Sequence, residues 1–156
     1  MRITSLMSEA LVLPEIQSVS RDEALREIVD HLVAHAEVEL QAQLVFDRLL
    51  ARERLASTAV GHGMAIPHAK LPGIADAIAC IGRSSAGVEF GAKDGSSTRI
   101  LLTIVAPEGN AGMHLKALAR ASRLLMDASF RRELLEAPDA VRMWSVIVAH
   151  DEGLST

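Results

Sequence analysis

The spacing of hydrophobic residues predicts several helices along the chain. Residues 20–23 read S-R-D-E, the pattern of a capping box, in which the serine oxygen accepts an amide hydrogen bond and the glutamate reaches back. The apolar side chains that follow recur every three or four residues, as on one buried helix face: Leu25, Ile28, Val29, Leu32 and Val33. The same spacing predicts helices over residues 39–52, 114–126 and 139–149.

Short apolar runs predict strands between these helices. Residues 77–83 and 99–105 are bounded by Gly, Ser, Pro and Asp, and residues 87–98 supply turn residues between the two runs. Residues 64–66 precede a proline, which favours an extended backbone. Helices mixed with non-consecutive strands predict an α/β fold in which helices flank a small mixed β-sheet. A chain of 156 residues is expected to form one domain, residues 1–156.

Composition excludes several classes of protein. Apolar residues make up 49% and charged residues 23%, as in ordinary globular proteins. Aromatic residues make up 3% and the net charge is −4, so we expect no nucleic-acid partner. No apolar run approaches the roughly 20 residues of a membrane span, and the N-terminus has no leader pattern. Cys80 is the single cysteine and is expected in the core of a cytoplasmic protein.

The strongest candidate for chemistry is His68. Residues 60–69 read V-G-H-G-M-A-I-P-H-A, which places this histidine directly after a proline at the mouth of a glycine-punctuated loop. Neither helical nor strand burial explains that succession, whereas binding and catalytic residues are frequent on such loops. A neutral imidazole nitrogen can attack phosphorus in line and form a phosphoramidate, so the pattern indicates phosphoryl transfer.

His114 is the second candidate. It follows the polar and glycine-rich residues 108–112 and lies at the start of a predicted helix. The positive end of the helix dipole favours the neutral imidazole and offers amide donors to an anion. The alternative is a capping or core role.

The remaining histidines carry weaker signals. His31 and His35 lie four residues apart on the first helix, but no third ligand accompanies them, so we interpret them as a polar helix face. His150 stands beside two acidic residues near the C-terminus and is expected to be a solvated residue at a helix end. His62 either has no role or tunes the pKa of His68.

Together with Glu53, seven residues before Val60, the His68 motif closely resembles the phosphorylated-histidine signature of the fructose/mannitol-type enzyme IIA domains of the bacterial phosphotransferase system. Those domains carry a second active-site histidine 46 positions after the first, which corresponds to His114. They carry an arginine 16 positions before it, which corresponds to Arg52. From spacing alone, the preferred interpretation of this arginine, together with Arg54, is the solvated end of a helix.

The resemblance covers nearly the whole chain and is greatest to the stand-alone nitrogen-regulatory enzyme IIA. It implies a phosphoryl group received on His68 from a small histidine phosphocarrier protein, with His114 and Arg52 stabilising its charge. It implies no cofactor and no metal, and as partners either regulatory target proteins or a IIB domain. Ala69, where glycine is common in the family, is a small departure.

Three alternatives remain open from the sequence. A sugar-specific enzyme IIA would use the same acceptor and pass the phosphoryl group to a permease IIB domain. A binding module would use the His68 loop without ever taking phosphate. A metal-dependent hydrolase would need His62, His68 and His114 to converge on zinc. The sequence does not assign which imidazole nitrogen carries the phosphoryl group.

Overall fold

Helices and strands follow one another along the whole of the computed structural model, which describes residues 1–154. Two short 3-10 helices, η1 and η2, precede the first strand. The elements run in the order η1 (Ile3–Ser5), η2 (Glu9–Leu11), β1 (Val12–Leu13), α1 (Arg21–His35), α2 (Ala42–Leu55), β2 (Ala59–Gly61), β3 (Met64–Ala65), β4 (His68–Leu71), β5 (Ile78–Val88), β6 (Thr98–Pro107), α3 (Ala111–Met126), α4 (Ala128–Glu136) and α5 (Ala140–Gly153).

The strands form one six-stranded mixed sheet in the order β1-β5-β6-β3-β2, with β4 also paired to β6. The long strands β5 and β6 are antiparallel to each other. The short strands β3 and β4 pair in parallel with successive parts of β6, at Ile100–Leu101 and at residues 104–107. The predicted α/β fold with a small mixed sheet and flanking helices is therefore confirmed.

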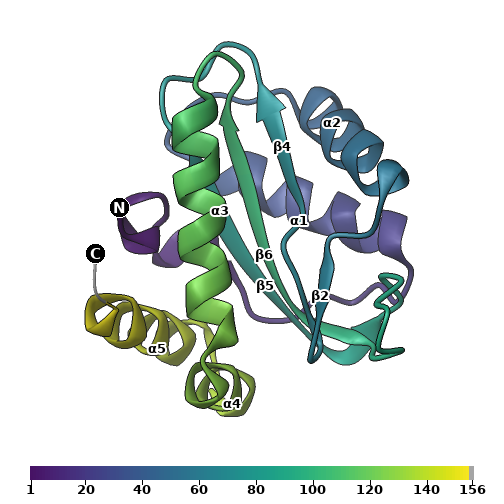
Figure 1. The fold of residues 1–156 in the computed structure, drawn as a ribbon, viewed down its shortest axis with the longest axis vertical. Helices are drawn as coiled ribbons and strands as arrows, with labels where there is room; N and C mark the ends of the chain where they lie inside the picture. Colours follow the sequence, from purple (N-terminus) through teal and green to yellow (C-terminus); the bar gives the residue numbers. More distant parts are fainter. Residues whose placement is uncertain (155–156) are drawn as a thin grey trace.

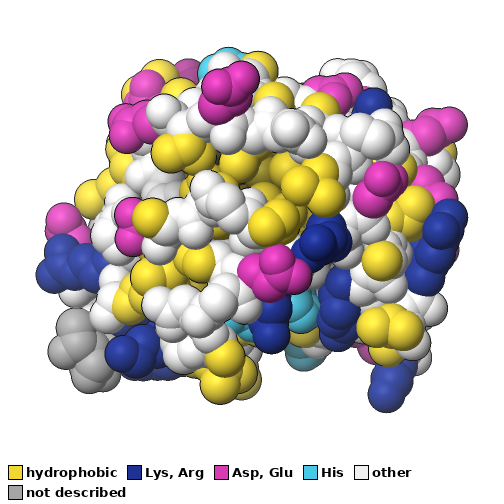
Figure 2. Space-filling view, turned by 90° about the horizontal axis from the view of Figure 1, so that it is seen from above, with side chains coloured by type: hydrophobic (Ala, Val, Ile, Leu, Met, Phe, Trp, Pro, Cys, Tyr) yellow, Lys and Arg dark blue, Asp and Glu magenta, His cyan; other side chains and the backbone are white. Residues whose placement is uncertain are grey.

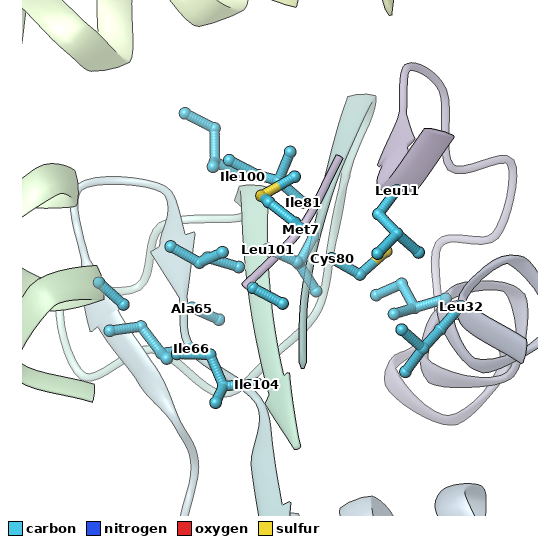
Figure 3. Packing of buried hydrophobic residues seen from close by; sticks show 14 of the residues in the cluster. Met7, Leu11, Leu32, Ala65, Ile66, Cys80, Ile81, Ile100, Leu101 and Ile104 are labelled. Atoms are coloured by element: carbon cyan, nitrogen blue, oxygen red, sulfur yellow. The ribbon is translucent and has the colours of Figure 1, made fainter. Parts of the chain in front are cut away.

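β6 is the central strand and is covered on both faces. Figure 1 shows α3 in front of the sheet and α1 behind it. All residues of β6 after Arg99 are buried, as expected for a strand sandwiched between helix layers. Figure 3 shows Ile81 and Cys80 of β5 packed close to Leu101 of β6, with Leu32 of α1 approaching from one side. Cys80 is fully buried, as predicted.

The hydrophobic pattern located the main elements but not their ends. The predicted helices at 39–52, 114–126 and 139–149 correspond to α2, α3 and α5, and the two predicted strands extend to form β5 and β6. The pattern did not predict β1, β2, β4 or α4. Helix α4 has nine residues and only two buried apolar side chains, Phe130 and Leu134, which is too little for a periodic signal.

Helix α1 begins after Ser20, as the capping box predicts, but the predicted capping hydrogen bond is wrong. Among the described residues, the Ser20 side chain makes no capping hydrogen bond. Its backbone instead forms an isolated parallel bridge with Glu89.

His150 also differs from its prediction as a solvated residue. It lies within α5, its side chain is 18% exposed, and Nε2 is hydrogen-bonded to the Glu133 carboxylate while Nδ1 lies 3.5 Å from Asp127. These two acids belong to the start and the middle of the α4 region, which the sequence did not place beside α5. The pair His31 and His35 agrees with a polar helix face, because each ring is hydrogen-bonded to a backbone carbonyl.

A buried ion pair joins three distant parts of the chain. Arg120 Nε of α3 donates to Asp151 Oδ1 of α5 at 2.8 Å, and the two side chains are 4% and 0% exposed. The other carboxylate oxygen accepts hydrogen bonds from Thr4 N and Thr4 Oγ1, each at 3.0 Å. Burial raises the pKa of Asp151, but the bonds from Thr4 and Arg120 hold that pKa below its ordinary value.

Within residues 1–154, no helix has the length and apolarity needed to cross a bilayer.

Replacing Asp151 by alanine should lower the free energy of unfolding by about 3–5 kcal/mol, because it leaves the buried Arg120 guanidinium without its carboxylate. Urea unfolding followed by circular dichroism measures the change. The matched control is Glu152→Ala, which removes an exposed carboxylate next to it and should change stability by less than about 0.5 kcal/mol. Equal effects of the two substitutions would contradict a structural role for the ion pair.

Candidate functional site

His68 is the first residue of β4 and lies at the partly exposed face of that strand. The sequence predicted a loop here; the structure instead pairs His68 with Ile104 of β6, which fixes its backbone. The ring Nδ1 lies 2.7 Å from the carbonyl oxygen of Ile66. Because a carbonyl oxygen only accepts hydrogen bonds, Nδ1 carries the proton. Nε2 then holds the lone pair, which makes it the nucleophilic atom of the ring.

A chain of hydrogen bonds holds the Ile66 carbonyl in place. Glu53, buried at the end of α2, accepts hydrogen bonds from the backbone N–H and the hydroxyl of Thr58, the former at 2.7 Å. The carbonyl oxygen of Thr58 accepts the N–H of Ile66 at 3.1 Å. The acidic residue of the sequence motif therefore acts on the segment that carries His68 through the backbone, in addition to the effect of its charge on the ring.

His114 lies in the first turns of α3, where Asn110 caps the helix by accepting the N–H of Met113. Its ring centroid is 5.5 Å from that of His68, with 58° between the ring planes. Among the described residues, no group hydrogen-bonds its buried Nδ1. A buried donor without an acceptor is costly, so we assign the proton to Nε2, which leaves an N–H donor on the other side of the ring.

Arg52, His68 and His114 line one cavity of about 570 Å³. The structure therefore brings together the three residues that the sequence singled out. Arg52 itself donates to the carbonyl oxygen of Ala56 at 2.7 Å, which keeps its guanidinium at the end of α2. On the face shown in Figure 2, several Lys and Arg side chains lie close to exposed histidine atoms.

Both histidines of the cavity favour the uncharged state. Burial lowers the pKa of His68; the Ile66 hydrogen bond raises it, the charge of Arg52 lowers it and that of Glu53 raises it, with a net decrease. Burial, followed by the nearby His68 and Lys70, lowers the pKa of His114. Neutral imidazoles keep their lone pairs at neutral pH, as a nucleophile requires.

His62 is not among the described residues that line this cavity. It occupies the tight turn between β2 and β3 with φ of 55°, and its N–H donates to Asp94 at 2.9 Å. The charges that act on His68 come from Arg52 and Glu53, so a tuning role for His62 finds no support.

Over residues 1–154, no three His, Cys, Asp or Glu side chains are grouped as metal ligands would be.

The sequence interpretation missed three further charged residues of the cavity: Arg48, Lys70 and Glu108. Lys70 has the same strand face as His68, two residues on, which the strand period would have indicated had β4 been predicted. Arg48 stands one helical turn before Arg52, a spacing visible in the sequence. Glu108 joins them only through the fold.

The chain is similar to known proteins over most of its length. Residues 5–149 match the family described as phosphoenolpyruvate-dependent sugar phosphotransferase system, EIIA 2. The chain is 38% identical to a nitrogen regulatory protein of Bradyrhizobium diazoefficiens, over 94% of this chain and 95% of that protein. It is 34% identical to the fructose-specific EIIABC component of Bacillus subtilis, over 97% of this chain but 24% of that longer protein.

A solved structure gives the same result for the fold. The crystal structure of the nitrogen regulatory protein IIA-Ntr from Neisseria meningitidis superposes with a TM-score of 0.83 at 26% identity, covering 93% of this chain and 98% of that one. The likeness thus extends over most of the fold. The chain belongs to the type-2 enzyme IIA family of the phosphoenolpyruvate-dependent sugar phosphotransferase system.

Proposed function

We propose that this chain, as one type-2 enzyme IIA domain, accepts a phosphoryl group on His68 from a histidine phosphocarrier and acts mainly as a nitrogen-type regulator in the cytoplasm. The observation that carries the proposal is the geometry of one cavity. A neutral imidazole with a free Nε2 lies 5.5 Å, ring to ring, from a second neutral imidazole, beside an arginine.

The transfer step follows from the His68 tautomer. The Nε2 lone pair attacks the phosphorus of the donor phosphohistidine, and a new P–N bond forms as the donor P–N bond breaks. The electron pair of the broken bond returns to the donor imidazole, which leaves as a neutral ring because its other nitrogen carries a proton. His68 keeps its Nδ1 proton and becomes positively charged, a state that the Ile66 carbonyl oxygen stabilises. Positioning and electrostatics supply the catalysis.

His114 and Arg52 would stabilise the transferred group. An N–H donor at His114 Nε2 can hydrogen-bond a phosphoryl oxygen, and the Arg52 guanidinium can neutralise its charge. No cofactor is needed for this step, because both reacting nitrogens belong to proteins.

The likeness to nitrogen regulatory proteins supports a regulatory output. Phosphorylation would add about −1.5 to −2 charges at one surface spot, which is enough to change which target proteins bind. The alternative is a sugar-specific enzyme IIA that passes the group to a IIB domain, as the similarity to a fructose-specific EIIABC component suggests. Transfer from the phosphorylated chain to a purified fructose IIB domain would favour this alternative.

His68→Ala should abolish phosphorylation, because it removes the only atom that we assign as nucleophile. The measurement is the incorporation of one acid-labile phosphate, detected by mass shift or radiolabel, from phosphoenolpyruvate through purified donor proteins. His62→Asn is the matched control in the neighbouring turn, where asparagine tolerates the positive φ, and it should be labelled normally. A labelled His68→Ala chain would refute the assignment. An unlabelled wild-type chain with a competent donor would favour the binding module, and zinc in the purified protein would favour the hydrolase.

His114→Ala should leave labelling possible but slow it by about 100-fold, the usual effect of losing one preorganised hydrogen-bond donor at developing charge. Rapid-quench labelling measures the rate. His114→Gln, which retains an N–H donor, should recover part of the loss. A rate equal to that of the wild type for His114→Ala would contradict a role in stabilising the phosphoryl group.

The rate of phosphoryl acceptance should decline at acidic pH with a midpoint below 6.5, the ordinary histidine pKa, because burial lowers the pKa of His68. Below its folded pKa, His68 gains a proton on Nε2 and loses the nucleophilic lone pair. Arg52→Ala removes a charge that lowers this pKa, so its acidic decline should begin at higher pH. NMR titration of the ring protons checks both values directly. A wild-type pKa above 6.5 would contradict the prediction.

A further inference from the structure

Arg48 has a place in the cavity that neither the motif nor the chemistry of His68 explains. It stands one turn before Arg52 on α2, and both side chains line the cavity of His68. Its Nη1 donates to the carbonyl oxygen of Lys70 at 3.0 Å and lies 3.4 Å from Glu108 Oε1. Arg48 is therefore held between β4 and the segment that leads into α3.

The packing of α2 on β4 places Arg48 beside the strand that begins with His68. Residues four apart on a helix are separated by about 6 Å along its axis, and residues two apart on a strand by about 6.6 Å. Arg48 contacts Lys70, two residues beyond His68, while the charge of Arg52 acts on His68 itself. Arg48 thus lies beside Lys70, about one helical turn from Arg52, in the cavity that His68 also lines.

The charges of the cavity favour such a change. Among its described lining residues, Arg48, Arg52 and Lys70 are cations and Glu108 is the one carboxylate, which leaves two positive charges in excess. A phosphoryl group on His68 adds about −1.5 to −2 charges and so balances them. The Arg48–Glu108 pair is weak, because its side chains are 38% and 53% exposed, whereas a phosphoryl group offers a higher charge and three acceptor oxygens.

We propose that Arg48 is a second phosphoryl-binding cation, held by Glu108 in the unphosphorylated chain and transferred to the phosphoryl group once it is on His68. This inference rests on the proposed function of His68. Glu108 then acts only through Arg48 and restrains it before phosphorylation. The alternative is that Arg48 only ties α2 to β4 and to the segment before α3.

Phosphoramidate can test the proposal without any partner protein. Its P–N bond breaks as the P–Nε2 bond of His68 forms, and ammonia leaves with the electron pair. Arg48→Ala should slow this acceptance by about 10-fold, the effect of losing one hydrogen bond to a charged group, and should shorten the lifetime of the phosphohistidine followed by phosphorus NMR. Arg54→Ala is the matched control, since it removes an exposed cation of the same helix that does not line the cavity, and should change neither value.

Glu108→Gln gives the effect that a merely structural role would not produce. It frees Arg48 and should speed acceptance by about threefold. In the double variant with Arg48→Ala, this gain should vanish, because Glu108 has no Arg48 left to restrain. Urea unfolding of each variant separates a loss of stability from a loss of phosphoryl binding.

The measurements on these variants separate a failure of the Arg48 inference from a failure of the proposed function. If Arg48→Ala matches Arg54→Ala in rate and lifetime, or if Glu108→Gln slows acceptance, Arg48 is a structural tie and the inference is wrong. If Glu108→Gln speeds acceptance equally with and without Arg48, the carboxylate acts by its own charge, and the inference is also wrong. If the folded wild-type chain takes no phosphate, the proposed function of His68 is wrong, and the role of Arg48 is not what failed.

Discussion

The hydrogen bond from His68 Nδ1 to the carbonyl oxygen of Ile66 is the contact on which the site depends. It decides the tautomer, and the tautomer decides that Nε2 is the free nitrogen of the ring. A carbonyl two residues away could point elsewhere if the backbone were flexible. Here it is fixed by the pairing of β4 with β6 and by the chain of bonds from buried Glu53 through Thr58. The distant acid of the motif thus acts through the backbone.

In this cavity the buried groups are neutral and the charged groups are more exposed. The two imidazoles are sufficiently buried that their pKa values fall, so two potentially charged rings can lie 5.5 Å apart as neutral groups. The permanent cations stand at the exposed rim, where solvent keeps the cost of desolvation small. An incoming anion would meet positive charge without protonating the nucleophile. Arg120, a more deeply buried cation, is paired with the carboxylate of Asp151.

The sheet gives this arrangement its precision. β6 pairs with β3 and β4 on one side and β5 on the other, and it lies beneath α3, so one strand connects the segments that carry His68 and His114. α2 packs along β4 and supplies the arginines. Because these elements are joined by buried apolar contacts, the three parts of the cavity hold their relative positions more firmly than surface loops would.

The sequence by itself determined the helices with strong apolar periodicity and the two long buried strands, and through its likeness to a family motif it singled out His68, His114 and Arg52. Local patterns suffice there, because spacing along one element dictates one buried face. Only the tertiary structure decided the tautomer of His68, the hydrogen bonds of Glu53 with Thr58, the pairing of His150 with Glu133 and the contact of Arg48 with Glu108. Most of these contacts join residues of different elements, 60 positions apart for Arg48 and Glu108, and no local pattern encodes which side chains the packing of a sheet and its helices will bring together.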